Sequence, residues 1–117
     1  MEKFSVILPL TGEYLTTVRL TTGGLCTLVG FTLDEAEDYK VCVTESLLIL
    51  KRNGFTRAEI EFSLSEVLGC KVSGLDANGE KGEDLEDEIS RALLSALVGK
   101  VEFLKENDRV VKVEFEG

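Results

Sequence analysis

The sequence predicts an α+β fold, a two-layer α/β sandwich whose sheet is mixed but mostly antiparallel and carries three helices on one face. Two observations lead to this. The elements follow the order β-α-α-β-β-α-β-β, and the later β-like runs come in adjacent pairs. Adjacent runs joined by short turns favour antiparallel hairpins. A doubly wound parallel sheet needs strands and helices to alternate, and here they do not.

The length and charge of the chain limit its organisation and its partners. A chain of 117 residues is expected to form one domain, spanning residues 1–117. The net charge of −9 leaves no basic patch to neutralise phosphates. Nucleic acid and anionic membranes are therefore not expected partners.

Cysteine and histidine usage narrows the chemistry. The three cysteines, Cys26, Cys42 and Cys70, lie in apolar stretches without metal-like spacing, which favours buried thiols in a reducing, cytoplasmic setting. The chain has no histidine, which excludes the Ser-His-Asp triad and the usual zinc sites. The short apolar run at the start predicts a strand rather than a signal peptide, and no stretch is long enough to span a membrane.

The first half of the chain predicts one strand and two helices. Residues 4–10 form a β-rich run that ends at Pro9, and residues 13–29 have apolar residues at helical spacing. Thr32 and Glu35 form a capping box at the start of a helix over residues 33–52. That helix becomes apolar nearly all round, so it is expected to be buried on most sides.

The second half predicts two strand pairs around a third helix. Strands are expected at residues 58–64 and 67–72, a turn-rich loop at 74–82, and a hairpin of residues 100–104 and 109–115 around Asn107-Asp108. A helix over residues 83–98 places six apolar residues on one face: Leu85, Ile89, Ala92, Leu93, Ala96 and Leu97.

Glu45 is unusual because it lies in the middle of the apolar part of the second helix. An ionised carboxylate needs pairing or water in such surroundings. One interpretation is a helix face that reaches water at Glu45, Arg52 and Asn53. The other is a carboxylate that faces a ligand cleft, where it could serve as a general base. The nearest basic residues in the sequence are Lys40 and Lys51.

The run from Tyr14 to Leu50 resembles the anti-sigma-factor serine kinases of the GHKL ATPase superfamily. The matching features are a Tyr-Leu-x-x-Val-Arg-Leu segment from Tyr14, the pair Gly30-Phe31, an acidic helix start, and Lys40-Val-x-Val-x-Glu45-Ser. The likeness implies a histidine kinase-like ATPase domain. It covers about the first half of the chain, and the second half follows the family only in the order of its elements.

The resemblance implies roles for two positions of the second helix. In the family a glutamate acts as base or orients the attacking group, and an asparagine four residues later binds magnesium. Glu45 matches the glutamate and is the candidate catalytic base if the protein is active. Ile49 stands at the asparagine position and offers no oxygen ligand, so no metal site is expected.

The nucleotide-binding motifs of the family are matched poorly. Asp76 and Gly79 are the nearest counterparts of its adenine-binding Asp-x-Gly-x-Gly motif, at the wrong spacing, and Asp76 could equally be a plain turn residue. The family's phosphate-binding lid is replaced by residues 80–88, which hold six acids and one lysine. Those carboxylates could simply stabilise the start of the third helix, but they oppose a bound triphosphate.

Two functions of different classes follow from the resemblance. The first is a degenerate kinase-like domain, not an enzyme, which acts as a regulatory module that binds a sigma factor or an anti-sigma antagonist and could form a homodimer. It would need no cofactor. The alternative is an active ATP-dependent serine kinase that phosphorylates an anti-sigma antagonist, with ATP and magnesium as cofactors. A third hypothesis is that Glu45 and Asp76 serve another small ligand.

Overall fold

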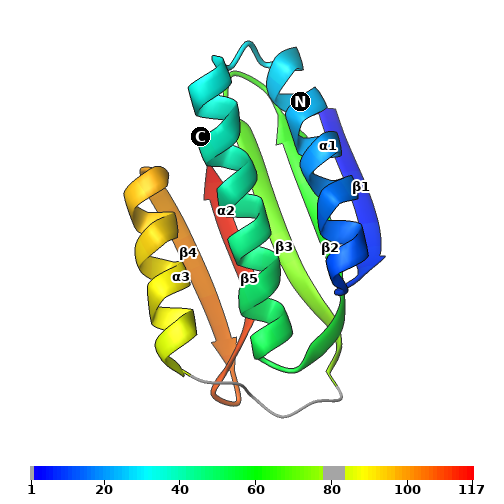
Figure 1. Cartoon of the computed structure of the whole chain (residues 1–117), viewed down its shortest axis with the longest axis vertical. Helices are drawn as coiled ribbons and strands as arrows, with labels where there is room; N and C mark the ends of the chain where they lie inside the picture. Colours follow the sequence, from blue (N-terminus) through cyan, green and yellow to red (C-terminus); the bar gives the residue numbers. More distant parts are fainter. Residues whose placement is uncertain (1, 78–83) are drawn as a thin grey trace.

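A computed structural model describes residues 2–77 and 84–117 of the chain. Its elements, drawn in Figure 1, are β1 (Glu2–Pro9), α1 (Gly12–Leu28), α2 (Leu33–Arg52), β2 (Phe55–Leu64), β3 (Leu68–Ala77), α3 (Asp84–Leu97), β4 (Lys100–Glu106) and β5 (Arg109–Glu116). No helix in these two ranges is both long enough and apolar enough to cross a membrane.

The five strands form one sheet in the order β1-β2-β3-β5-β4. All four pairings between these neighbours are antiparallel. The three helices lie side by side on one face of the sheet, with α2 in the middle (Figure 1). The predicted two-layer sandwich is confirmed. These strands form an antiparallel sheet rather than the mixed one predicted. The strands β3 and β4, which α3 joins, are separated by β5, and β1 and β2, which α1 and α2 join, pair antiparallel.

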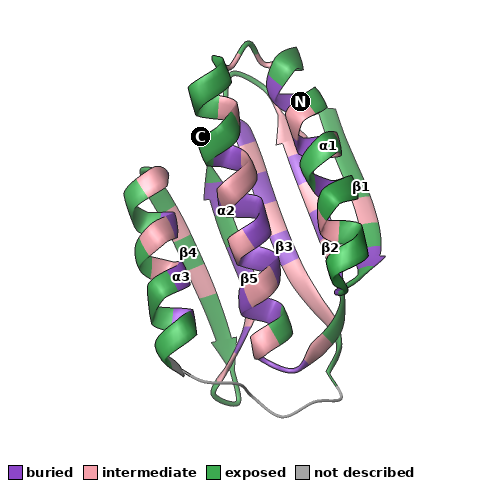
Figure 2. Ribbon diagram, in the orientation of Figure 1, coloured by how far each residue is buried: buried purple, intermediate pink, exposed green. Residues whose placement is uncertain are grey.

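The core lies between the sheet and the helix layer. Ala58, Ile60 and Phe62 of β2 point into it, whereas the alternate residues Glu59 and Glu61 are only half-buried on the opposite face. Figure 2 shows that α2 differs, because its residues from Tyr39 to Leu50 are all buried or half-buried. The alternation in β2 follows from the two-residue period of a strand with one covered face.

Helix α2 begins and ends where the sequence predicts. The Thr32 hydroxyl accepts a hydrogen bond from the Glu35 backbone N–H at 3.2 Å, and the Glu35 carboxylate accepts one from the Thr32 backbone N–H at 2.8 Å. The predicted capping box is therefore confirmed. The apolar wrap is explained by the central place of α2, which contacts α1, α3 and three strands.

Two predictions about β3 need correction. The strand does not end at residue 72, and residues 74–77 belong to β3 rather than to a loop. Gly74 pairs with Ala58, and a Cβ atom on Gly74 would meet the Phe55 ring at 2.5 Å. A glycine in this strand therefore makes room for an aromatic ring, a tertiary contact that looks like a turn signal in the sequence. The rest of the predicted loop lies outside the described residues.

The terminal hairpin is confirmed with longer strands than predicted. Asn107 and Asp108 have positive φ values of 51° and 64°, as expected for the two central residues of a type I′ turn. The strands extend to Glu106 and Glu116 on either side of it. The twist of such a turn matches the right-handed twist of the flanking strands, whose register shifts once, between Leu104 and Lys105.

Helix α3 is turned in a direction that its sequence does not suggest. Leu85 and Ile89 of its apolar face are 64% and 60% exposed. The side that packs on the protein carries Asp87 and Ser90, followed by Leu94. An apolar helix face normally covers the core. The start of α3 is instead held by a polar interaction, while its end is anchored by Leu94, which is buried in the core.

Candidate functional site

That polar interaction lies at the contact between α2 and α3. Arg52, the last residue of α2, donates from Nε to Oδ1 of Asp87 at 2.7 Å. The Asp87 side chain is only 4% exposed and that of Arg52 is 18% exposed. A carboxylate buried to this degree is stable only when paired and hydrogen-bonded. Arg52 therefore fixes which side of α3 faces the protein.

Asn53 completes the partners of Asp87. This residue is fully buried just after α2, where it donates from Nδ2 to Oδ2 of Asp87 at 2.8 Å and to the Ile49 carbonyl at 2.7 Å. Its Oδ1 accepts a hydrogen bond from the backbone N–H of Val110 at 3.0 Å. The amide thus joins α2, α3 and β5, and each of its polar atoms has a partner.

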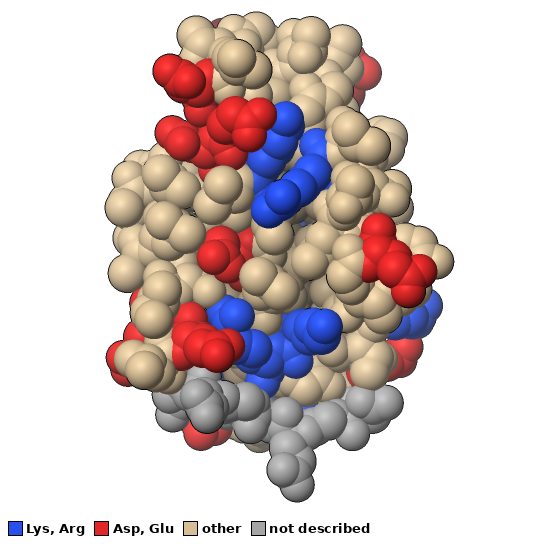
Figure 3. Space-filling view, in the orientation of Figure 1, with Lys and Arg blue, Asp and Glu red and all other residues tan. Residues whose placement is uncertain are grey.

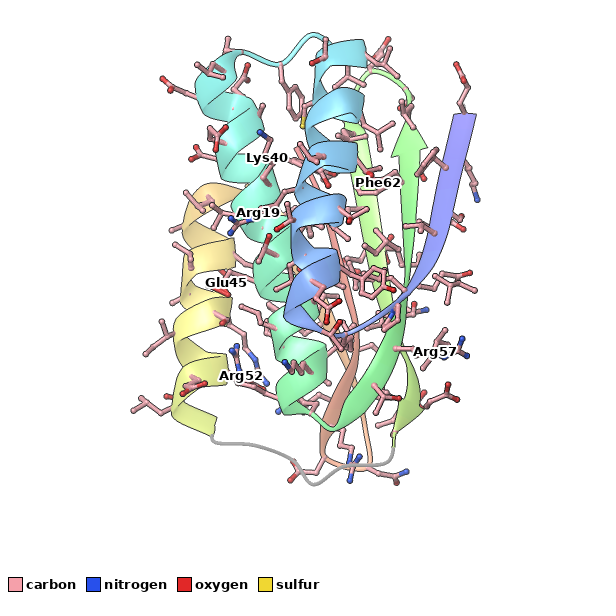
Figure 4. The ribbon with its side chains drawn as sticks, turned by 45° about the vertical axis from the view of Figure 1, so that its right-hand side comes forward. Arg19, Lys40, Glu45, Arg52, Arg57 and Phe62 are labelled. Atoms are coloured by element: carbon pink, nitrogen blue, oxygen red, sulfur yellow. The ribbon has the colours of Figure 1, made fainter. Side chains whose placement is uncertain are left out.

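Glu45 lies further along the same helix contact. Ser90 of α3 donates to Oε2 of Glu45 at 3.4 Å and accepts a hydrogen bond from Nη2 of Arg52. Figure 4 shows Glu45 and Arg52 on the side of α2 that faces α3. Glu45 is half-buried rather than sealed in the core. Ser90 thus links Glu45 to the basic residue Arg52. The sequence had indicated Lys40 and Lys51 as the nearest basic residues instead.

Two interpretations of this helix face were open: a water-exposed face with Glu45, Arg52 and Asn53, or a Glu45 carboxylate that faces a ligand cleft. The structure tests the first. Arg52 and Asn53 do not lie on a water-exposed face with Glu45, because α3 covers them and Asn53 has no exposed surface. The missed signal is the i, i+7 spacing from Glu45 to Arg52, which puts both side chains on one side of a helix. Whether Glu45 serves as a base stays a prediction.

Ile49 is completely buried in the core. It lies one helical turn after Glu45, yet its side chain belongs to the apolar cluster under α2, while Glu45 lies beside α3. The position that the family resemblance assigns to a metal ligand is therefore an apolar core position in this protein. Within the described residues no group of three or more cysteines and carboxylates could hold a metal ion.

Asp76 lies at the end of β3 with a positive φ of 56°. Its Oδ2 accepts a hydrogen bond from Nε of Arg57 at 2.6 Å, and its carbonyl accepts one from the Thr56 hydroxyl at 2.9 Å. Asp76 is thus paired with the neighbouring strand β2, whereas Glu45 is paired with α3. Gly79, the other predicted adenine contact, lies outside the described residues.

A second polar group lies where α1 meets α2. Arg19 donates from Nε to the Thr44 hydroxyl at 3.2 Å, and Lys40 pairs with Glu37 at 3.1 Å. A Cβ atom on Gly23 would lie 2.9 Å from Cε of Lys40, so this glycine gives the lysine room to cross α1. Lys40 and Arg19 lie close together in Figure 4, and Figure 3 shows basic atoms gathered on this face. No local pattern in the sequence indicates this pair.

Each of the three thiols belongs to the buried core. Cys26, Cys42 and Cys70 are free and buried, as predicted. Burial raises the pKa of Cys42 to about 12, and it raises the pKa values of Cys26 and Cys70 as well. Thiols held in the neutral form are poor nucleophiles. They act here as small apolar side chains.

Comparison with known proteins gives one relevant similarity. A 49-residue stretch is 39% identical to the serine-protein kinase RsbW of Bacillus mycoides (strain KBAB4). The alignment covers 39% of this chain and 31% of the relative, so the chain spans about a third of the length of the curated relative it matches. No family model matches the chain. The similarity suggests a relationship to the anti-sigma-factor serine kinases.

Proposed function

We propose that this protein is a regulatory protein-binding module of the anti-sigma-factor type, a degenerate kinase-like domain that does not hydrolyse ATP. The observation that carries the proposal is the seating of α3 on α2 through Asp87, Arg52 and Asn53. In this contact the polar side chains of Arg52 and Asn53 hold α3 in place. The contact also places Ser90 directly against Glu45, the one candidate base.

Two further features support the loss of nucleotide chemistry. Phosphoryl transfer depends on metal ions and donors that neutralise the phosphates. Ile49 provides an apolar core side chain where the family resemblance implies a magnesium ligand. The Phe55 ring fills the space above Gly74, two residues before the candidate adenine contact Asp76.

The proposed partner is a sigma factor or an anti-sigma antagonist. The support is the 39% identity to the serine-protein kinase RsbW, which falls in a single 49-residue stretch. The family resemblance of the run from Tyr14 to Leu50 points to the same partners. Co-elution of the purified protein with either partner in size-exclusion chromatography tests this part of the proposal.

Calorimetric titration with Mg-ATP tests the non-catalytic part. We expect no affinity tighter than about 1 mM and no transfer of radiolabelled phosphate to an antagonist, because the phosphates would lack both metal and donors. An Ile49→Asn variant should not gain affinity, since restoring one ligand leaves the other defects in place.

The alternative is an active ATP-dependent serine kinase with Glu45 as base. It is favoured by one observation, the half-exposed position of Glu45. Micromolar Mg-ATP binding that a Glu45→Gln variant retains, together with phosphate transfer that this variant loses, would establish the kinase and overturn the proposal.

A further inference from the structure

The outward face of α3 is an apolar stripe that no element of residues 2–77 and 84–117 covers. It consists of exposed residues that recur every three or four positions, with the half-buried Leu93 at its edge: Leu85, Ile89, Ala92 and Ala96. Leu85 and Ile89 are among the most exposed large apolar side chains of the described residues. From Leu85 to Ala96 the stripe runs about 17 Å, or three helical turns. Contiguous apolar surface of this kind marks interaction sites.

The stripe is held outward by the structure. Asp87 and Ser90 lie on the opposite side of α3, where Arg52 binds both of them. Rolling α3 to bury Leu85 and Ile89 would pull the Asp87 carboxylate away from Arg52 and Asn53, leaving buried charges without partners. The contacts of Asp87 with Arg52 and Asn53 therefore keep the apolar residues exposed to another molecule.

The charged residues beside the stripe indicate which charge a binding partner has. Glu86 and Glu88 are exposed on its two sides, near the start of α3. The Glu86 carboxylate also lies 3.9 Å from Nη1 of Arg52, and the Glu86 side chain is 63% exposed. Arg91 is the single basic residue of α3, and its guanidinium stacks on the Phe103 ring of β4 at 5.5 Å, away from the stripe. Figure 3 shows the surface over α3 as uncharged with acidic side chains toward its lower end.

This pattern disfavours a second copy of the chain as the occupant. Each copy has a net charge of −9, and α3 offers no lysine or free arginine to face the glutamates of another α3. A partner with positive charges would instead be attracted to the stripe and oriented on it.

We propose that the stripe on α3 binds an amphipathic helix of a partner protein, with aliphatic residues at i, i+3, i+4 and i+7 spacing and lysines or arginines on both flanks. The aliphatic residues would pack on Leu85 and Ile89, and the flanking cations would lie beside Glu86 and Glu88. This inference rests on the proposed protein-binding function and specifies the chemistry of its partner.

Two fluorescein-labelled synthetic helices of about 18 residues, the length of five turns, test the proposal. Both carry leucines at the stated spacing. One has lysines on its flanks and the other has glutamates. Titrated with the intact protein and followed by fluorescence anisotropy, the lysine peptide should bind with a Kd of about 100 µM or tighter, and the glutamate peptide should not. Raising NaCl from about 50 to about 300 mM should weaken the binding several-fold.

Matched variants separate the stripe from the overall charge of the protein. L85S/I89S should lower the affinity at least about tenfold. The control L20S/L33S, which removes two still more exposed leucines elsewhere, should change it less than about twofold. Glu88→Lys should weaken binding more than Glu66→Lys, because both change the net charge equally but Glu66 lies in the exposed segment between β2 and β3.

Chemical shift mapping on the wild-type protein gives a readout that needs no variant, and we expect the shifts to cluster on α3. Equal binding of both peptides, equal losses in test and control variants, or shifts clustered on α1 would overturn the proposal. So would a stable dimer in sedimentation velocity that Ile89→Ser dissociates. Micromolar Mg-ATP binding with intact peptide binding would refute the non-catalytic function and leave this site standing. If the protein binds neither Mg-ATP nor the lysine peptide, the proposed α3 site is refuted and the non-catalytic function is not.

Discussion

The Nδ2 of Asn53 and the Oδ2 of Asp87 lie 2.8 Å apart, although 34 residues separate them in the chain. The same amide accepts a hydrogen bond from Val110 through Oδ1. One fully buried side chain therefore ties the end of α2 to a helix on one side and a strand on the other. Four consequences of the structure can be measured.

Replacing Asp87 with alanine should lower the free energy of unfolding by about 3 kcal/mol, because Arg52 and Asn53 would lose a buried charged partner. Urea denaturation followed by circular dichroism measures this. Glu88→Ala, on the exposed side of the same helix, should change stability by less than about 0.5 kcal/mol. Equal effects of the two variants would show that Asp87 does not hold α3.

Replacing Ile49 with asparagine should destabilise the protein by about 3 kcal/mol or more. The side chain has no exposed surface, so the variant would both remove apolar packing and bury an amide in the core. Thermal and urea unfolding measure the loss. Ile49→Val is the matched control, with an expected cost of about 1 kcal/mol. A variant as stable as wild type would mean that position 49 reaches solvent.

The three thiols should be unreactive in the folded protein. With Ellman's reagent at about pH 8 we expect no labelling within minutes, because each thiol is buried and burial raises its pKa. All three should react once guanidinium unfolds the chain. Fast labelling of the native protein would contradict the buried positions, and single serine variants would identify the reactive residue.

Stability should fall in acid partly through Glu35. Hydrogen bonds with Thr32 hold the pKa of Glu35 below its ordinary value of 4.5. The bond from the Thr32 backbone N–H has the largest effect on this pKa, and the bond with the Thr32 side chain comes second. A carboxylate with a lowered folded-state pKa stabilises the fold fully above its unfolded-state pKa, and this contribution is lost as the pH falls through the folded-state value. The stability difference between wild type and Glu35→Gln should therefore shrink below about pH 4.5.

Chemical denaturation at a series of pH values provides that measurement. Glu66→Gln serves as the control, since it removes a carboxylate from an exposed segment without removing a helix cap. A stability difference for Glu35→Gln that stays constant from neutral to acid pH would contradict the role of the capping box.

Local signals in the sequence predict most of the architecture. The capping box of Thr32 and Glu35 locates the start of α2, and Asn107-Asp108 locates the terminal turn, because each depends on residues within a few positions of one another. The extent of β3 could not be predicted in this way. Gly74 lies in a strand because the Phe55 ring of the neighbouring strand covers it, and that neighbour is brought there by the sheet.

The candidate site divides in the same manner. The sequence by itself determined that Glu45 is an isolated carboxylate in an apolar helix and that Ile49 offers no metal ligand, since both follow from residue type and helical spacing. The tertiary structure decided that Asn53 is a core residue, that Asp87 points inward and that Leu85 and Ile89 point outward. Periodicity favours the reverse orientation for α3. At its start the direction follows from Arg52 and Asn53, which lie 34 or more residues earlier and pair with the buried Asp87. At its end it follows from Leu94, which packs in the core.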